Sequence, residues 1–285
     1  MSNPSPPRRV TSLRQFGLSV LDRALLGGIV ASWSYRCGLH GALRVTRHEV
    51  RPELANRLPA PLKLAFASDF HAGPTTHPEI FERVVDELVA HEPDVLLLGG
   101  DYVSCRSEYL EALCAALERV RPRLGTYAVL GNHDLWAGGA RIVRRLEASG
   151  MQVLVNRNCA LPEPFGCISV CGIDDPWIGD ADVAAAFQGA GPIRIFLAHS
   201  PDSLLLLGDE RFDVGFAGHT HGGQVALPNG TQIVTAGGPL CRAYGRGRFD
   251  LPGNGPLIVS RGVGCAILPI RINSDPELVL CTLCP

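Results

Sequence analysis

The sequence lacks an apolar run long enough to cross a membrane. In the apolar segment near the N-terminus the longest uncharged stretch, residues 24–35, covers about twelve positions, whereas a transmembrane helix needs about 20. It also lacks the small-residue cleavage site of a secretory signal, and Arg8 and Arg9 do not stand in a twin-arginine pattern. The sequence therefore favours neither a transmembrane nor a secreted protein.

Motifs of several common functional classes are missing. The chain has no P-loop, no G-x-S-x-G elbow and no basic face rich in aromatic residues. These absences leave NTP-driven chemistry, serine hydrolysis and dedicated nucleic-acid binding without support. With 46% apolar and 19% charged residues in 285, the composition is that of a globular protein, and the length suits one α/β catalytic domain plus a tail.

The sequence also lacks the cysteine pattern of a disulfide scaffold, although it contains ten cysteines. They are scattered, and several fall within apolar runs, which favours buried free thiols in a reducing compartment. Cys281 and Cys284 have the spacing of half a zinc or redox site, but no second pair accompanies them. We therefore expect a cytoplasmic protein with free cysteines.

Acidic residues are scarce near the N-terminus, which divides the chain into two parts of opposite charge. Residues 1–60 hold nine Arg and three acidic side chains, and the remainder carries 17 basic and 25 acidic ones. An acidic body suits cation binding, and a basic arm suits an anionic surface. We predict a disordered basic tail over residues 1–12, an apolar and basic arm over 13–57, and a catalytic domain over 58–285.

The arm carries apolar residues at helical spacing between Leu13 and Tyr35. Two interpretations follow from this pattern. The helix either lies in a membrane surface with its Arg side chains on anionic headgroups, or packs onto the catalytic domain. We favour the first, which predicts a peripheral protein on the inner face of the cell membrane.

Apolar strands and amphipathic helices alternate after residue 58, which predicts an α/β sheet. The later part is richer in strands and glycine and implies a second sheet. We predict strands at residues 62–68, 94–99, 126–130, 152–155, 167–171, 193–198, 213–217, 231–235, 256–260 and 277–281. We predict helices at residues 78–91, 107–121, 138–149, 181–187 and 201–208.

Polar residues with metal-binding side chains follow five of these strands. They are Asp69 and His71, Asp101, Asn132 with His133 and Asp134, His199, and His219 with His221. In α/β sheets the carboxyl ends of strands form the crevice where ligands bind, so residues far apart in sequence can converge there. Carboxylate, amide and imidazole donors without cysteine are typical of sites for Mn, Fe or Zn.

These blocks occur in an order that resembles the calcineurin-like metallophosphoesterases. The blocks are D-x-H at Asp69, G-D at Gly100, G-N-H-D at Gly131, the lone His199, and G-H-x-H at Gly218. Within that superfamily the chain is similar to a bacterial branch with the motif GHTHGGQ, here 218–224, followed by Y-x-x-G at 244–247 and VSRG at 259–262. The resemblance implies a four-layer αββα sandwich of two mixed β-sheets flanked by helices.

The resemblance also implies how the polar residues divide their work. Two divalent cations are expected as cofactors, most simply Mn, with Fe or Zn as alternatives. In this interpretation Asp69, His71 and His221 bind one cation, and Asn132, His199 and His219 bind the other. Asp101 binds both cations. Two cations roughly 3.5–4 Å apart can activate a shared water and neutralise the charge of a phosphate. His133 is expected to contact the phosphate and protonate the leaving group, with Asp134 orienting it.

The expected function is therefore hydrolysis of a phosphodiester or pyrophosphate by a metal-dependent hydrolase. The branch includes broad phosphodiesterases and UDP-2,3-diacylglucosamine pyrophosphatases, so a lipid-linked substrate at a membrane is our first hypothesis. A soluble phosphodiesterase or phosphatase acting on nucleotides or other small phosphoesters is the alternative. A non-catalytic scaffold is disfavoured, because no ligand position of the motif is replaced.

Overall fold

The computed structural model describes residue 20 and residues 25–285. The predicted tail, residues 1–12, and the arm residues 13–19 and 21–24 lie outside the described residues. The helices are α2 (Ile29–Arg36), α3 (Glu79–His91), α4 (Leu110–Leu117), α5 (Asn132–Ala148) and α6 (Val183–Phe187), with short 3-10 turns η1 (Leu26–Gly28), η2 (Ala55–Arg57), η3 (Ser107–Tyr109), η4 (Pro201–Leu206) and η5 (His221–Gly223).

The first sheet has six strands in the order β1-β12-β2-β3-β4-β5. They are β1 (Arg44–Val50), β12 (Glu277–Leu283), β2 (Leu62–Ala67), β3 (Val95–Leu98), β4 (Thr126–Ala128) and β5 (Gln152–Val153). Only the β12–β2 pairing is antiparallel, with Cys281 opposite Leu64. The central strands β2, β3 and β4 run parallel and are almost entirely buried, as their continuous apolar sequences require.

The second sheet also has six strands, in the order β10-β11-β9-β8-β7-β6. They are β10 (Gly247–Phe249), β11 (Leu257–Val259), β9 (Val214–Ala217), β8 (Ile193–Leu197), β7 (Ile168–Gly172) and β6 (Arg157–Ala160). The two edge pairings are antiparallel and the inner ones are parallel, so both sheets are mixed.

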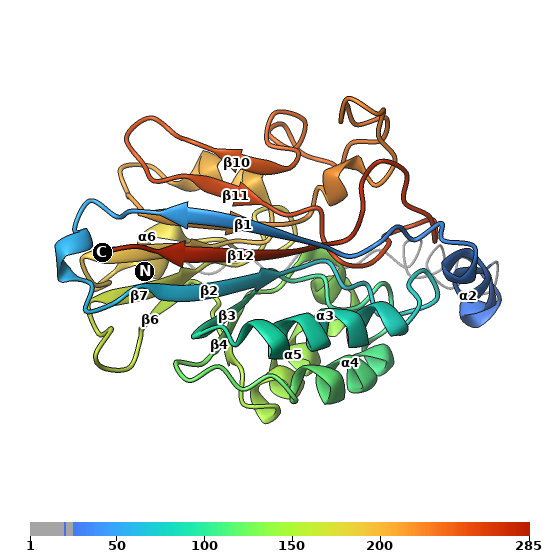
Figure 1. The fold of residues 1–285 in the computed structure, drawn as a ribbon, viewed down its shortest axis with the longest axis horizontal. Coiled ribbons are helices and arrows are strands. Elements are labelled where there is room, and N and C mark those ends of the chain that lie inside the picture. The colour runs from blue at the N-terminus through green and yellow to red at the C-terminus, as the bar shows by residue number, and fades with distance from the viewer. Residues whose placement is uncertain (1–19, 21–24) are drawn as a thin grey trace.

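Two sheets and two layers of helical structure form the predicted four-layer αββα sandwich (Figure 1). Side chains of both sheets, including Phe66 and Phe216 with ring centroids 5.3 Å apart, make the core between them. Helices α3, α4 and α5 bury an apolar face on the outer side of the first sheet. Phe187 of α6 packs on Phe196 on the outer side of the second sheet. The predicted fold class is confirmed.

The described part of the arm contributes a helix and a strand. Helix α2 buries Ala31 and Ser34 against the domain but leaves Ile29 and Trp33 exposed. Strand β1, which the sequence did not predict, pairs with β12 from Arg44 to Val50 as the edge of the first sheet. Its charged residues Arg44, Arg47 and Glu49 obscured this strand, because all three are exposed and interrupt the apolar pattern. Among the described residues, no helix has the length and hydropathy needed to cross a membrane.

Most other predicted elements are present with shifted ends, but the strand predicted at residues 231–235 is wrong. That segment carries only an isolated bridge between Ala226 and Gln232. Ile233 and Val234 are 57% and 60% exposed, so their apolar character does not mark a buried strand. Helix α5 begins at Asn132, six residues before the predicted start, and passes through a kink at Gly138.

Candidate metal centre

Five parallel strands end at one side of the molecule and bring the predicted metal ligands together. The ligands follow β2, β3, β4, β8 and β9 directly in the chain. Five of them adopt left-handed backbone conformations with φ between 45° and 68°, namely Asp69, His71, Asp101, His219 and His221. Non-glycine residues adopt this region at a cost, and such strain is concentrated at functional sites. The turns therefore direct these side chains toward a common centre.

Glycines beside the ligands permit these turns. Gly100 has a φ of 85°, and a Cβ there would lie 2.4 Å from the backbone nitrogen of Gly131. A Cβ on Gly131 would lie 2.2 Å from Oδ1 of Asp101. No side chain fits at either position, so the two strand-end turns can approach each other only through glycine.

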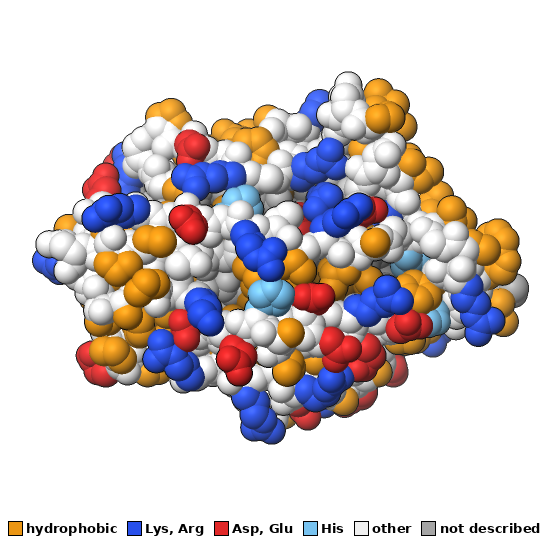
Figure 2. All heavy atoms as spheres, in the orientation of Figure 1, with side chains coloured by type: hydrophobic (Ala, Val, Ile, Leu, Met, Phe, Trp, Pro, Cys, Tyr) orange, Lys and Arg blue, Asp and Glu red, His pale blue; other side chains and the backbone are white. Residues whose placement is uncertain are grey.

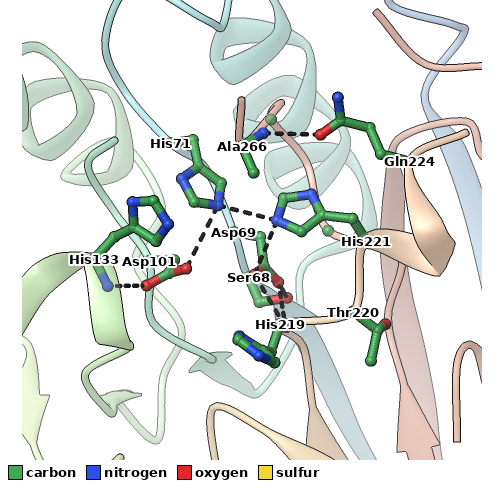
Figure 3. Close-up of polar contacts among 12 residues, drawn as sticks. Ser68, Asp69, His71, Asp101, His133, His219, Thr220, His221, Gln224 and Ala266 are labelled. Carbon is green, nitrogen blue, oxygen red and sulfur yellow. Dashed lines mark hydrogen bonds and ion pairs between the residues drawn. The ribbon is translucent and has the colours of Figure 1, made fainter. Parts of the chain in front are cut away.

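Asp69, His71 and His221 form a first donor group (Figure 3). Nε2 of His71 lies 3.0 Å from Nε2 of His221, which lies 3.5 Å from Oδ1 of Asp69. All three side chains are buried. The hydroxyl of Ser68 donates to Oδ2 of Asp69 at 2.6 Å and holds this carboxylate in place.

Asn132, His199 and His219 form a second donor group. Nε2 of His199 lies 3.2 Å from Oδ1 of Asn132 and 3.1 Å from Nδ1 of His219. The remaining ring nitrogens face backbone carbonyls, with Nδ1 of His199 2.8 Å from the oxygen of Gly99 and Nε2 of His219 3.1 Å from that of Gly237. Donation to a carbonyl through one nitrogen leaves the other free to bind a metal.

Asp101 lies between the two donor groups. Its Oδ2 is 3.5 Å from Nε2 of His71 and 3.4 Å from Nε2 of His199, and its Oδ1 accepts a hydrogen bond from the backbone nitrogen of His133 at 2.8 Å. One carboxylate oxygen is thus close to a histidine of each group, which places Asp101 where a ligand shared by two cations would lie.

The protonation states fit a cation-binding site. Burial lowers the pKa of His71 and of His221 well below 6.5, which favours the neutral imidazoles that bind metals. Burial alone would raise the pKa of Asp101, but the surrounding histidines, led by His199, hold it well below its usual value. Burial raises the pKa of Asp69 to about 6. Burial alone would lower the pKa of His199, but the neighbouring carboxylates, led by Asp101, raise it well above 6.5, so His199 would release a proton on binding a metal. Buried imidazole nitrogens and carboxylates aimed at one another fit two divalent cations.

His133 lies beside the two donor groups, and a backbone carbonyl fixes the orientation of its ring. Its Nδ1 lies 2.6 Å from the carbonyl oxygen of Ser104, and its ring packs edge-on against His71 with centroids 4.7 Å apart. If Nδ1 donates to that carbonyl, Nε2 remains available in the site. His133 also lines the cavity over the donor groups and packs against Trp136.

Asp134 is buried behind the site and contacts main-chain groups. Its carboxylate accepts hydrogen bonds from the backbone nitrogens of Asp101, Tyr102 and Gly131 at 2.7, 2.9 and 3.0 Å. Burial, and then the charge of Asp101, raise the pKa of Asp134 to about 8. We expected Asp134 to orient the ring of His133, but the hydrogen bond that holds that ring goes to Ser104. The contacts of Asp134 instead join the turns after β3 and β4.

A cavity of about 380 Å³ opens above the donor groups, which suits a small-molecule ligand. The metal-binding side chains form its polar part, and its apolar lining includes Trp136, Val234, Ile267 and Leu268. Sequence reasoning missed these four residues. Trp136 could have been found, because it lies three positions after His133 in α5 and so on the same face. Residues 267 and 268 carry no motif.

Some other histidine and arginine side chains lie away from this cavity. His77 stacks on Tyr35 with ring centroids 4.4 Å apart and is not part of the lining. Arg246 and Arg248 donate to the carbonyl oxygens of Asn273 and Glu49 and do not line it either.

The chain is similar to known proteins in sequence and in structure. The family model of the calcineurin-like phosphoesterases matches residues 62–223. The chain is 30% identical over 232 residues to phosphodiesterase YaeI of Escherichia coli (strain K12), covering 79% of this chain and 83% of that protein. It is 26% identical over 281 residues to the uncharacterized metallophosphoesterase YkuE of Bacillus subtilis (strain 168), covering 95% and 97%. Among solved structures, a 5'-nucleotidase precursor from Thermus thermophilus is similar with a TM-score of 0.47 at 16% identity, over 72% of this chain and 49% of that one.

Proposed function

This chain belongs to the calcineurin-like phosphoesterase family and is a metal-dependent hydrolase of phosphoester bonds, and we propose that its substrates are phosphodiesters or pyrophosphates that carry a lipid group. The observation that carries the proposal is the convergence of two donor groups on Oδ2 of Asp101, below a cavity with apolar walls.

In the proposed site Asp69, His71 and His221 hold one divalent cation, and Asn132, His199 and His219 hold the other, with Asp101 shared. Neutral nitrogen and carboxylate donors suit Mn, and Fe or Zn are alternatives. When bound, such a pair of cations offsets the charge of a phosphoryl group and makes water a better nucleophile.

The protein's own contribution to the reaction is to fix these donors and to supply a proton. Gly99 and Gly237 present carbonyls that hold the rings of His199 and His219, and Ser104 holds the ring of His133. We assign to His133, in its imidazolium form, a hydrogen bond from Nε2–H to the phosphoryl group and transfer of that proton to the leaving oxygen, which leaves a neutral ring whose Nδ1–H still donates to Ser104. Asp134 acts through the backbone by holding the turns that carry Asp101 and Gly131.

Exposed apolar side chains at the cavity and on α2 support a substrate that carries a lipid group. Ile267 and Leu268 line the cavity and are 62% and 52% exposed, and Ile29 and Trp33 of α2 are 65% and 63% exposed. Figure 2 shows apolar side chains gathered along the end of the molecule that carries α2. Exposed apolar patches of this kind mark binding sites or membrane contacts. We therefore propose that residues 13–57 bind an anionic membrane surface and that the protein is peripheral on the cytoplasmic face.

A concrete substrate is UDP-2,3-diacylglucosamine, which hydrolysis would convert to the lipid monophosphate and UMP. The test is a panel of phosphomonoesters, phosphodiesters, nucleotide sugars and acylated nucleotide sugars, each assayed with Mn²⁺. Turnover of the acylated nucleotide sugar well above its deacylated form supports the proposal. Turnover of aryl phosphodiesters with the lipid left intact would reject this substrate.

A second candidate function is hydrolysis of nucleotides or other small phosphoesters without membrane contact. It is favoured by the packing of α2 on the domain, where Tyr35 stacks on His77 and lies edge-on to His40. Flotation with vesicles containing anionic lipid separates the two candidates. Protein that stays unbound and cleaves nucleotide diesters faster than lipid-linked ones supports the second.

A further inference from the structure

A short loop, residues 264–270, forms one wall of the cavity beside the metal-binding side chains. Ile267 and Leu268 lie at its tip and line the same cavity as His71 and His221. Both side chains are more than half exposed, so they are held at the cavity without being buried in the core. When a ligand covers an apolar side chain held in that position, the burial of apolar surface makes binding more favourable.

The side chain of Gln224 fastens this loop to the metal-binding turn. Its Nε2 donates to the carbonyl oxygens of Leu268 at 2.7 Å and Ile270 at 2.9 Å, and its Oε1 accepts from the backbone nitrogen of Ala266 at 2.9 Å. Figure 3 shows the last of these contacts close to the ring of His221. Gln224 lies three residues after His221, so one short segment carries both a metal ligand and the support of the apolar wall.

The described part of the arm holds the same loop from the outside. The hydroxyl of Ser34 in α2 donates to the carbonyl oxygen of Pro269. The backbone nitrogen of Arg271 donates to the carbonyl oxygen of Leu39 at 2.7 Å, and its side chain donates to that of Gly264 at 3.0 Å. The loop is therefore held at both ends and in its middle, and its tip can present a fixed apolar surface.

We propose that the loop forms a subsite for an alkyl or acyl group of the phosphoester, and that Gln224 is the positioning residue that sets this preference. The inference rests on the proposed function, because it places the phosphate of the ligand at the metal centre. Gln224 also lines the cavity, but its side-chain hydrogen bonds all go to the loop backbone, so it sets the preference by holding Ile267 and Leu268 in place.

Binding of alkyl phosphates to the metal-loaded protein tests the subsite without turnover. Octyl phosphate, kept below its micelle concentration, and methyl phosphate share the phosphate and differ only in the alkyl group. Each buried methylene strengthens binding by roughly fourfold, so burial of two gives a preference for the octyl compound of roughly fifteenfold. The measurement is the dissociation constant of each compound by calorimetry, with the metal content of the same sample.

Two variants test whether Gln224 and the loop set the alkyl preference, and a third variant is the control. Gln224→Met keeps the length of the side chain but none of its hydrogen bonds, and Leu268→Asn changes the wall itself. Both should lower the octyl preference to roughly threefold or less. Val155→Asn, at an exposed apolar residue outside the cavity lining, should keep the wild-type preference.

Several outcomes would overturn the subsite. The first is that the wild-type protein binds octyl phosphate and methyl phosphate with equal affinity. The second is that Gln224→Met loses its metal. The third is that Leu268→Asn keeps the octyl preference but no longer binds vesicles. The last result would make the loop a membrane contact. A clear octyl preference in a protein that hydrolyses no phosphodiester would leave the subsite standing and reject the proposed function.

Discussion

Replacement of His133 by Ala separates the chemistry from metal binding. The ring of His133 is held by the carbonyl of Ser104 at 2.6 Å, whereas its backbone nitrogen donates to Oδ1 of Asp101 at 2.8 Å. His133→Ala removes the ring but keeps the backbone donor. We therefore expect Asp101 to stay in place and the protein to retain its metals.

The size of the effect follows from what the ring provides. General acid catalysis contributes roughly 10²–10⁴ in rate, or about 3–5 kcal/mol in the activation free energy. For His133→Ala we expect kcat to fall by about this factor on an alkyl leaving group. The fall should be smaller on p-nitrophenyl diesters, because their leaving group needs no proton. Loss of the bond to Ser104 should lower the free energy of unfolding by only about 1 kcal/mol.

The assay compares kcat for the two leaving groups and metal content by mass spectrometry in wild-type protein and His133→Ala. His77→Ala is the matched control, since His77 stacks on Tyr35 outside the cavity lining and its loss should leave both quantities near wild type. If His133→Ala lost its metals, or slowed both leaving groups equally, the assignment of His133 as proton donor would be refuted.

Three further predictions concern stability. Asp134→Ala leaves four backbone donors without their acceptor and should lower the free energy of unfolding by about 3 kcal/mol, with loss of metal, measured by urea unfolding and metal analysis. Gly100→Ala places a Cβ 2.4 Å from the backbone nitrogen of Gly131 at a φ of 85°, so the melting temperature of this variant should be several degrees lower than that of the wild type. Gly150 also has a positive φ but has open space around it, so Gly150→Ala should lower the melting temperature less. Burial, and then the charge of Arg271, lower the pKa of His40 from 6.5 to about 4. The folded protein therefore binds this proton less readily than the unfolded chain, and stability that is complete above pH 6.5 should decline toward pH 4 by up to about 3 kcal/mol. His40→Gln should weaken that decline in urea titrations at pH 7 and 4.5, and an identical pH profile would contradict the assignment.

The sequence predicted the polar centre because its residues follow strands that could be recognised from their apolar character. Asp69, Asp101 and His199 each come after a buried strand whose carboxyl end faces the centre. Parallel pairing of these strands then brings distant residues together. The division of the donors into two metal sites came from the family resemblance, and it remains a proposal.

The apolar wall could not be predicted in this way. Ile233 and Val234 were interpreted as a strand because apolar runs usually indicate burial, yet both are exposed, and Val234 lines the cavity. Ile267 and Leu268 lie on a loop that Gln224, Ser34 and Arg271 hold beside the site, and such long-range hydrogen bonds leave no periodic pattern in the sequence. Strand β1 was missed for a related reason, since its pairing with β12 depends on a segment more than 200 residues away.

The most direct test of the central claim is a crystal structure of protein grown with Mn²⁺, with anomalous diffraction recorded to locate the metal. The account predicts two anomalous peaks roughly 3.5–4 Å apart. One should contact Asp69, His71 and His221 and the other should contact Asn132, His199 and His219, with Asp101 reaching both. A single peak, or a pair held by other residues while these seven stay unligated, would contradict it.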